Sequence, residues 1–166
     1  MEDANKSKAQ LLKELITLRG LEQSLKAHTD ELRQSEERYR LIVEASPVSI
    51  TAIRNGQVLF TNPAAARMLG FFDHEEMVGI HSLSVVAPES QEVVAERIKR
   101  LECGKDNPPV EIALISQDEM RVAVESTSTS IPIGGISTAV IFARDISDRK
   151  QREKNATIIR EKATIR

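Results

Sequence analysis

The sequence is short of several residue types, and each shortage excludes a class of structure or function. Cys103 is the single cysteine among 166 residues, so neither an intrachain disulfide nor a multi-cysteine zinc site can form. No stretch approaches the roughly 18 consecutive apolar residues of a membrane-spanning helix, and no signal-peptide core follows the first residues. With no tryptophan, one tyrosine and four phenylalanines, the chain offers little aromatic surface for stacking exposed bases. We therefore expect a cytoplasmic chain with no membrane span and no nucleic-acid partner.

Charge imbalance and catalytic motifs are also lacking. The 23 Lys and Arg residues nearly balance the 25 Asp and Glu residues, and the formal net charge of -2 favours no class of partner. The sequence contains no glycine-rich phosphate loop, no Walker lysine motif and no G-x-S-x-G nucleophile motif. We expect the chain not to be an enzyme.

The first 45 residues have no proline and one glycine, as a long helix requires. Apolar residues recur there at every seventh position, which is typical of helices that pair along a seam, namely Leu11, Leu18, Leu25, Leu32 and Tyr39. A companion set three residues further on is less regular, namely Leu21, His28, Ser35 and Ile42. We expect residues 1–45 to form a coiled-coil-like helix that pairs with its twin in a homodimer.

The pattern changes after Pro47, and we expect a globular domain over residues 46–146. Runs at 49–54 and 57–61 are rich in β-forming residues and flank Asn55-Gly56, a dipeptide typical of tight hairpins. A short helix is then predicted, with Asn62 as its cap, Pro63 in its first position and Gly70 at its end.

Two further helical pieces are predicted in the middle of this domain. A capping-box pattern at Asp73 to Glu76 starts the first, and Met77 to His81 continues it. The second begins at Pro88 and ends before Gly104, with an inward stripe of Val94, Ile98 and Leu101.

Strands at 110–116, 120–131 and 136–146 predict an antiparallel meander. The last strand is apolar on both faces. We assign Thr138, Val140 and Phe142 to the core. The residues that alternate with them, Ala139, Ile141 and Ala143, are assigned to an outer face that another surface must cover. Residues 147–166 are polar with helical spacing, and we expect a connector helix there.

Four segments resemble, in the same order, the PAS (S-box) family of sensor domains. They are residues 35–47 (SEERYRLIVEASP), 55–71 (NGQVLFTNPAAARMLGF), 75–79 (EEMVG) and 143–150 (ARDISDRK). Ser147 stands where the family's terminal Asp-Ile-Thr motif has threonine. The resemblance implies an α+β fold, in which a five-stranded antiparallel sheet carries short helices on one face between the long N-terminal helix and the connector helix.

The resemblance also implies a pocket between sheet and helices that holds a small molecule or cofactor of unknown identity. Our candidates for its lining are Phe60, Met68, Met77, His81, Val94, Ile98, Val122, Val140 and Phe142. A b-type haem on a helix histidine is disfavoured because residues 89–103 contain no histidine. A light-oxygen-voltage flavin adduct is disfavoured because the segment after Gly79 contains no cysteine.

Several chemically capable side chains are interpreted as structural. We expect His28 to be solvated or in the seam, His74 to sit at a helix start, and His81 to be a structural histidine, with a hydrogen bond to a ligand as the alternative. Cys103 is expected to pack incidentally, and the methionines Met68, Met77 and Met120 to fill the core rather than to mark an adaptable pocket. We expect the basic residues of the tail to form a solvated helix face, namely Arg149, Lys150, Arg152 and Lys154.

Together these features predict a sensory and dimerisation module of a histidine kinase or transcriptional regulator. By the resemblance, the signal leaves through Asp145, Ile146 and Ser147, where the Asp145 carboxylate caps or salt-bridges the connector helix. The alternative is a ligand-free scaffold for protein association. No metal site is expected.

Overall fold

The computed structural model describes residues 7–164, and the chain divides into two compact units after Ile42. The first unit consists of most of α1 (Lys8–Glu44), a 37-residue helix with no buried side chain.

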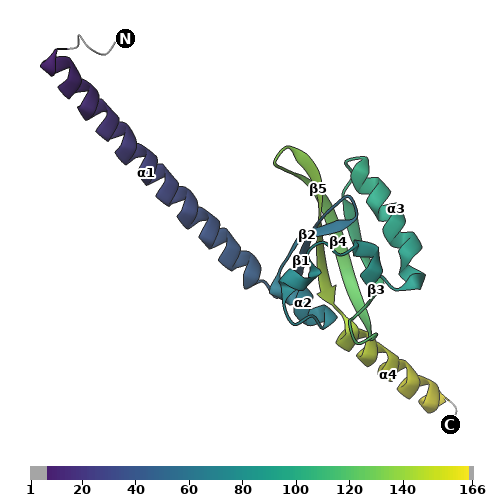
Figure 1. Ribbon diagram of the computed structural model, residues 1–166. Helices are drawn as coiled ribbons and strands as arrows, with labels where there is room; N and C mark the ends of the chain where they lie inside the picture. Colours follow the sequence, from purple (N-terminus) through teal and green to yellow (C-terminus); the bar gives the residue numbers. More distant parts are fainter. Residues whose placement is uncertain (1–6, 165–166) are drawn as a thin grey trace. The chain divides into compact units, whose positions relative to one another are not determined.

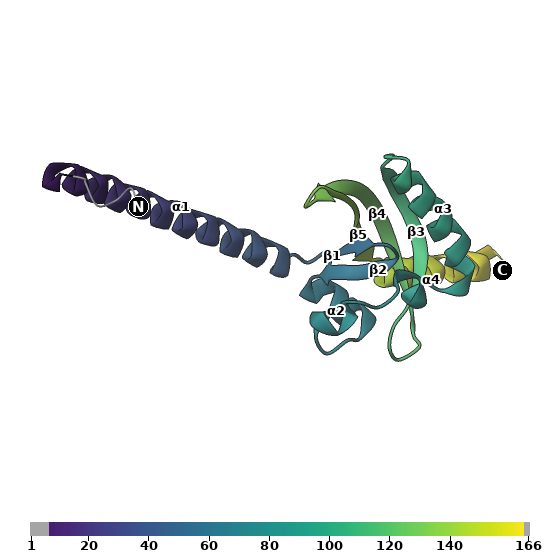
Figure 2. The same cartoon turned by 45° about the horizontal axis from the view of Figure 1, so that its top comes forward.

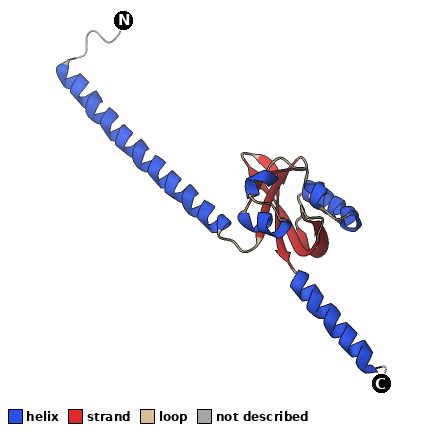
Figure 3. Cartoon of the chain, turned by 60° about the horizontal axis from the view of Figure 1, so that its bottom comes forward, coloured by secondary structure: helices blue, strands red, loops and turns tan. Residues whose placement is uncertain are grey.

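The second unit contains one five-stranded antiparallel sheet, seen in Figure 1 and coloured red in Figure 3. Its strands are β1 (Ser49–Arg54), β2 (Gln57–Thr61), β3 (Asn107–Ile115), β4 (Arg121–Ile133) and β5 (Ile136–Asp145). They lie in the order β2-β1-β5-β4-β3, so the first hairpin pairs with the last strand. This sheet confirms the predicted fold class.

The first hairpin forms as its sequence predicts. Asn55 and Gly56 both have positive φ angles, of 52° and 78°, which is the backbone that a two-residue hairpin turn requires. The pairing register shifts between Ala52 and Ile53, where β2 contributes an extra residue.

The helix α2 (Pro63–Leu69) follows with its predicted punctuation. The Asn62 side chain accepts a hydrogen bond from the Ala65 N–H, Pro63 occupies the first turn, and Gly70 ends the helix with a φ of 77°. Its alanines and Leu69 are buried, so this helix packs closely against the sheet.

The segment after α2 differs from the prediction. Three short 3₁₀ helices follow, η2 (His74–Met77), η3 (Ser82–Val85) and η4 (Pro88–Ser90), before α3 (Gln91–Glu102). The predicted continuation from Met77 to His81 is wrong, because Gly79 has a φ of 86° and its N–H donates to the Val58 carbonyl at 2.7 Å. This stretch therefore pairs with β2 instead of continuing a helix.

The strand β3 begins three residues before its predicted start and includes Pro108 and Pro109. It lies at the edge of the sheet, where a residue without an N–H is tolerated. The chain ends with α4 (Ser147–Thr164), the predicted connector helix. In the described residues, 7–164, no helix is long and apolar enough to cross a bilayer.

The core lies between the sheet and the helical segments that follow β2. Its most buried members come from both sides, namely Ala65, Leu69, Met77 and Val124. Figure 2 shows α2 beside β1 and β2, while α3 lies beside β3 and β4. Between these two contacts the helices and the sheet leave an internal space.

Candidate functional site

A cavity of about 500 Å³ lies within the second unit, between the sheet and the helical segments. All five strands contribute to one side of its lining, β2 through Val58, and α2, η2, η3 and α3 contribute most of the other. This volume falls within the usual range for sites that hold small molecules.

The sheet side of the cavity carries a row of hydroxyl groups. Ser126 and Ser128 on β4 are buried, at 4% and 6% exposure, although both line the cavity. The register places Ser126 opposite Ala143 of β5, which in turn lies opposite Ser49 of β1. The Ser128 hydroxyl accepts a hydrogen bond from the Asn107 amide, whereas no hydrogen bond within the described residues involves the hydroxyl of Ser126 or of Ser49.

The helix side of the cavity is mostly apolar. It includes Met68 and Leu69 from α2, Met77 from η2, and an i, i+4, i+7 stripe on α3 formed by Val94, Ile98 and Leu101. One member of this α3 face is charged, because Arg97 also lines the cavity.

Arg97 is held by two backbone carbonyls. Its Nη1 donates to the Pro108 oxygen at 2.8 Å, and its Nη2 donates to the Ser126 oxygen at 3.0 Å. Burial lowers the pKa of Arg97, and the nearby Arg100 charge lowers it further. A guanidinium nevertheless stays protonated at neutral pH, so Arg97 brings a positive charge to an apolar wall.

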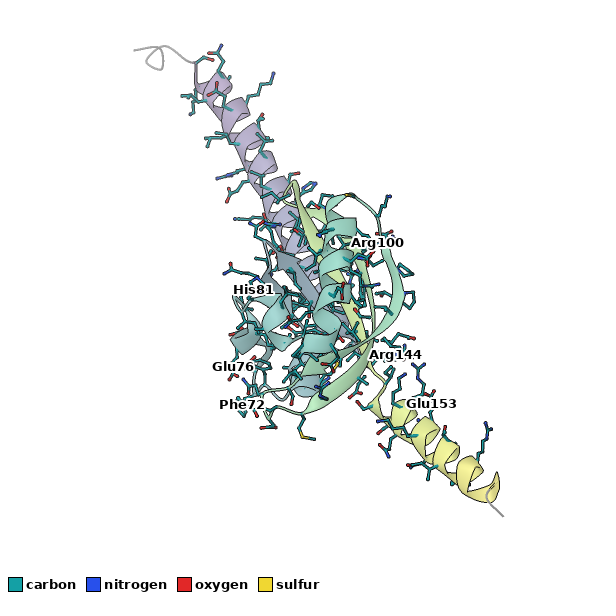
Figure 4. All side chains as sticks on the ribbon, turned by 90° about the vertical axis from the view of Figure 1, so that its right-hand side faces the viewer. Phe72, Glu76, His81, Arg100, Arg144 and Glu153 are labelled. Carbon is teal, nitrogen blue, oxygen red and sulfur yellow. The ribbon has the colours of Figure 1, made fainter. Side chains whose placement is uncertain are left out.

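A buried amide fixes α3 to the sheet beside this arginine. The Asn107 Nδ2 donates to the Arg97 carbonyl at 2.9 Å and to the Ser128 hydroxyl at 3.0 Å, while its Oδ1 accepts from Arg100 Nε at 3.0 Å. Figure 4 shows Arg100 on α3. These hydrogen bonds therefore fix α3 relative to strand β4 at the cavity wall.

Four of the nine predicted lining residues line the cavity, namely Met68, Met77, Val94 and Ile98. Their role in binding stays a prediction. Val122 is buried in the core beside the cavity without lining it. Met120, which was expected to fill the core, is 66% exposed.

The predicted faces of β5 are reversed. Ala139, Ile141 and Ala143 line the cavity, whereas Val140 and Phe142 alternate onto the opposite face of the sheet. Phe60 lies in the same row as Val140 on that face, since both are register partners of Ala52. The prediction followed side-chain size, but small residues on the inner face are what leave room for a cavity.

His81 does not line the cavity. Its Nδ1 accepts a hydrogen bond from the Leu83 N–H at 3.3 Å, which caps η3, and its ring packs against Gly56. Figure 4 shows it at the edge of the domain. The preferred interpretation of His81 as a structural residue therefore matches its contacts.

The other candidates lie outside the cavity. His28 is exposed on α1 and hydrogen-bonded to the Ser24 carbonyl, and His74 contacts the Asp73 carboxylate at 3.1 Å. Cys103 is exposed, so its predicted packing role is wrong. Nowhere in the described residues do three or more His, Cys, Asp or Glu side chains gather as they would around a metal ion.

At the exit of the domain, Asp145 accepts a hydrogen bond from the Ser147 N–H at 2.7 Å. Buried Ile146 donates from its N–H to the Ala123 carbonyl at 2.8 Å, and the Ala123 N–H donates to the Ser147 hydroxyl at 3.3 Å. Glu111 of β3 forms ion pairs with Arg149, at 2.5 Å, and with Lys150. These contacts attach the first turn of α4 to β3 and β4.

The five residues of the predicted dimer seam lie on α1 and are all exposed, namely Leu11, Leu18, Leu25, Leu32 and Tyr39. Their exposure ranges from 47% for Leu11 to 68% for Leu25 and Leu32. A row of large apolar side chains with no cover is what an unpaired coiled-coil helix presents.

Arg97 and the serines of β4 were not among the predicted lining residues, although both leave a signal in the sequence. Arg97 interrupts the α3 stripe that Val94, Ile98 and Leu101 define. In β4 the buried alternation of Val122 and Val124 continues into Ser126 and Ser128, so polar residues occupy core positions. Polar residues at positions that should be apolar indicate a lined cavity.

Comparisons with known proteins agree with this architecture. A family model described as the PAS fold matches residues 37–146. Sporulation kinase A of Bacillus subtilis is 27% identical over 124 residues, which are 74% of this chain and 20% of the kinase. The chain thus spans a fifth of the length of the curated relative that it matches.

Two solved structures share the fold. The PAS domain of an HTR-like protein from Haloarcula marismortui has a TM-score of 0.64 at 20% identity, covering 73% of this chain and 99% of that one. A domain of a sensory box sensor histidine kinase/response regulator from Geobacter sulfurreducens has a TM-score of 0.57 at 20% identity, covering 69% and 96%. With its central 110 residues matched by the family model and its sheet shared with these structures, the chain belongs to the PAS family of sensory domains.

Proposed function

We propose that this chain is the sensory and dimerisation module of a cytoplasmic histidine kinase, and that it binds a small molecule in its cavity. The observation that carries the proposal is the cavity of about 500 Å³ inside the domain, lined by both apolar and hydroxyl groups. The similarity to a sporulation kinase and to a domain of a sensor histidine kinase supports the kinase setting. In this proposal the chain binds and transmits, and catalysis belongs to another domain.

The path from cavity to output runs along two adjacent strands. On β5, Ala139, Ile141 and Ala143 line the cavity, and the strand then continues directly into Asp145 and α4. On β4, Ser126 and Ser128 line the cavity, while Ala123 holds Ile146 and Ser147. A ligand that shifts either strand would therefore shift the first turn of α4.

Dimerisation is assigned to α1 with a second copy of this chain as its partner. A helix of 37 residues with no buried side chain depends on a partner, because most helical stability in proteins comes from packing. The sevenfold spacing from Leu11 to Tyr39 suits a second identical helix. The outer face of the sheet, on which Phe60 and Phe142 are exposed, is a further candidate surface for that copy.

The dimer proposal predicts that Leu25→Glu combined with Leu32→Glu yields a monomer. Burying four unpaired carboxylates in the seam weakens association by at least about a hundredfold. Sedimentation velocity measures the change, and Gln23→Glu with Gln34→Glu serves as the control, since it adds the same charge off the seam. A dimer that survives the seam substitutions would contradict the assignment.

The ligand proposal is tested by native mass spectrometry of protein purified from cells. We expect excess mass on the wild type, loss of that mass in Val94→Phe, which fills the cavity from α3, and its retention in Val93→Phe on the exposed side of the same helix. A bare wild-type mass, with no rise in melting temperature across a metabolite library, would instead favour the ligand-free scaffold.

A further inference from the structure

Within the part of the chain that the structure describes, no carboxylate pairs with Arg97, a cation on the cavity wall. Its contacts to the Pro108 and Ser126 carbonyls use two of the five guanidinium N–H groups. Arg54, the other arginine in the lining, belongs to β1 and donates to the Thr138 hydroxyl and the Ile133 carbonyl. Among the described lining residues none carries a carboxylate, and a partly buried charge without a counter-charge is costly.

Hydroxyl groups lie next to this cation. The Arg97 Nη2 donates to the backbone oxygen of Ser126, and no hydrogen bond within the described residues involves the Ser126 hydroxyl. Ser128 lies two residues along the same face, and its hydroxyl accepts from Asn107, which leaves its own hydrogen free to donate. The arginine and the two serines thus offer several donors from one part of the lining.

Apart from Ser82, the rest of the helix side is apolar. Met68, Met77, Val94 and Ile98 offer no hydrogen-bonding side chain to a ligand, and together they suit a hydrocarbon body. A ligand that suits both the hydrogen-bond donors around Arg97 and the apolar helix side carries one negative group at one end and an apolar body at the other.

We infer that the ligand is a small carboxylic acid, whose carboxylate pairs with Arg97 and accepts from Ser126 and Ser128 while its apolar body packs against α2 and α3. A planar carboxylate matches the fork of a guanidinium. A phosphate ester carries more charge than Arg97 alone balances, and a neutral ligand leaves Arg97 without a counter-charge. This inference rests on the proposed function and specifies its ligand.

The test compares octanoate with 1-octanol, which differ in the carboxylate and share the hydrocarbon chain. Isothermal titration calorimetry of the full chain is expected to show octanoate binding at least about tenfold more tightly than octanol. This comparison needs no variant and so does not depend on how a substitution folds. The matched pair 3-phenylpropanoate and 3-phenylpropanol extends it to an aromatic body.

Two substitutions test whether the Arg97 charge causes the preference for octanoate over octanol. Arg97→Gln is expected to remove the preference for octanoate while leaving octanol binding in place, whereas Lys99→Gln, which removes an exposed charge from the same helix, leaves both unchanged. Amide shifts at Ser126 and Ser128 on adding octanoate would place the carboxylate beside them.

Each contrary result has a separate meaning. Equal binding of acid and alcohol to the wild type, or undiminished preference in Arg97→Gln, would overturn the carboxylate assignment and leave ligand sensing intact. Binding of octyl phosphate with neither carboxylate bound would overturn it in favour of a phosphate ester. If none of these probes binds, the assignment is also refuted, and the native mass spectrum decides whether another ligand occupies the cavity.

Discussion

The two ends of the sensory domain are joined to the core in different ways. At the incoming end, Asn62 is fully buried and makes four hydrogen bonds, accepting from the N–H groups of Ile50 and Ala65 and donating to the carbonyls of Val43 and Val48. At the outgoing end, Asp145 is exposed and its side chain accepts one bond, from the Ser147 N–H.

This difference indicates where a signal can act. A buried amide with all of its donors and acceptors used is costly to disturb, because any lost partner stays unsatisfied. Exposed contacts can exchange with water, so each contributes less and is easily released. We therefore expect cavity-linked movement to appear in α4 before it appears around Asn62.

The largest expected effect is that of Asn62→Ala. The substitution removes all four side-chain hydrogen bonds of Asn62, although the Ala65 N–H keeps the Asn62 carbonyl and the carbonyls of Val43 and Val48 keep donors from Ser46. We therefore expect the domain to lose about 2 kcal/mol of stability. Differential scanning calorimetry of the full chain measures this, and Gln57→Ala in the exposed part of the same hairpin is the control. A loss no greater than that of Asp145→Ala would remove the contrast between the two ends.

Asp145→Ala is expected to act locally. Without the carboxylate at the helix start, amides in the first turn of α4 should exchange about fivefold faster, while those of β1 and β2 keep their protection. Hydrogen exchange resolved by NMR measures both regions in one experiment. Asp145→Asn keeps an oxygen acceptor and should restore most of the protection, whereas unchanged exchange in Asp145→Ala would refute the coupling role.

Glu111→Gln is expected to loosen the same turn by less than Asp145→Ala. It removes the carboxylate that pairs with Arg149 and Lys150, but these groups are solvent-exposed and the pairs are correspondingly weak. The difference from wild type should vanish in about 1 M salt, where the Debye length falls to about 3 Å. Glu92→Gln, on α3, is the matched control; an effect of Glu111→Gln that persists in high salt would exclude an electrostatic cause.

Much of this fold could be predicted from the sequence because local signals and tertiary structure agree. Asn55-Gly56 and Gly70 adopt positive φ angles, and Asn62-Pro63 supplies a capping side chain and a first-turn proline, as the sequence predicts. The helix predicted to continue from Met77 to His81 was wrong, because the polar residues from Asp73 to Glu76 suit a helix start whereas the backbone after Met77 pairs with β2.

The candidate site was harder to predict, because a cavity depends on small or polar side chains at inward-facing positions. The face of β5 was assigned by side-chain size, which placed Phe142 inward and Ala143 outward, the reverse of the structure. Arg97 and Ser126 were passed over because binary patterning treats polar residues as solvent-facing. Periodicity locates the inward positions, and the polar residues found there then mark the site.

The smallest expected effect distinguishes charge from packing at the outgoing end. The hydrogen bond from Lys150 lowers the pKa of Glu111 and outweighs desolvation, which raises it, and the charges of Lys150 and Arg149 lower it further. A carboxyl group with a lowered pKa in the folded state contributes stability above its ordinary pKa and loses it as the pH falls through the lowered value.

The attachment of α4 should therefore be constant from neutral pH down to the ordinary carboxyl range and weaken only below it. A carboxyl ¹³C titration of Glu111, read together with the amide shifts of the first α4 turn, checks this, and both should change together in the wild type. If the α4 shifts move with pH in Glu111→Gln as they do in the wild type, the Glu111 ion pairs do not hold the outgoing helix.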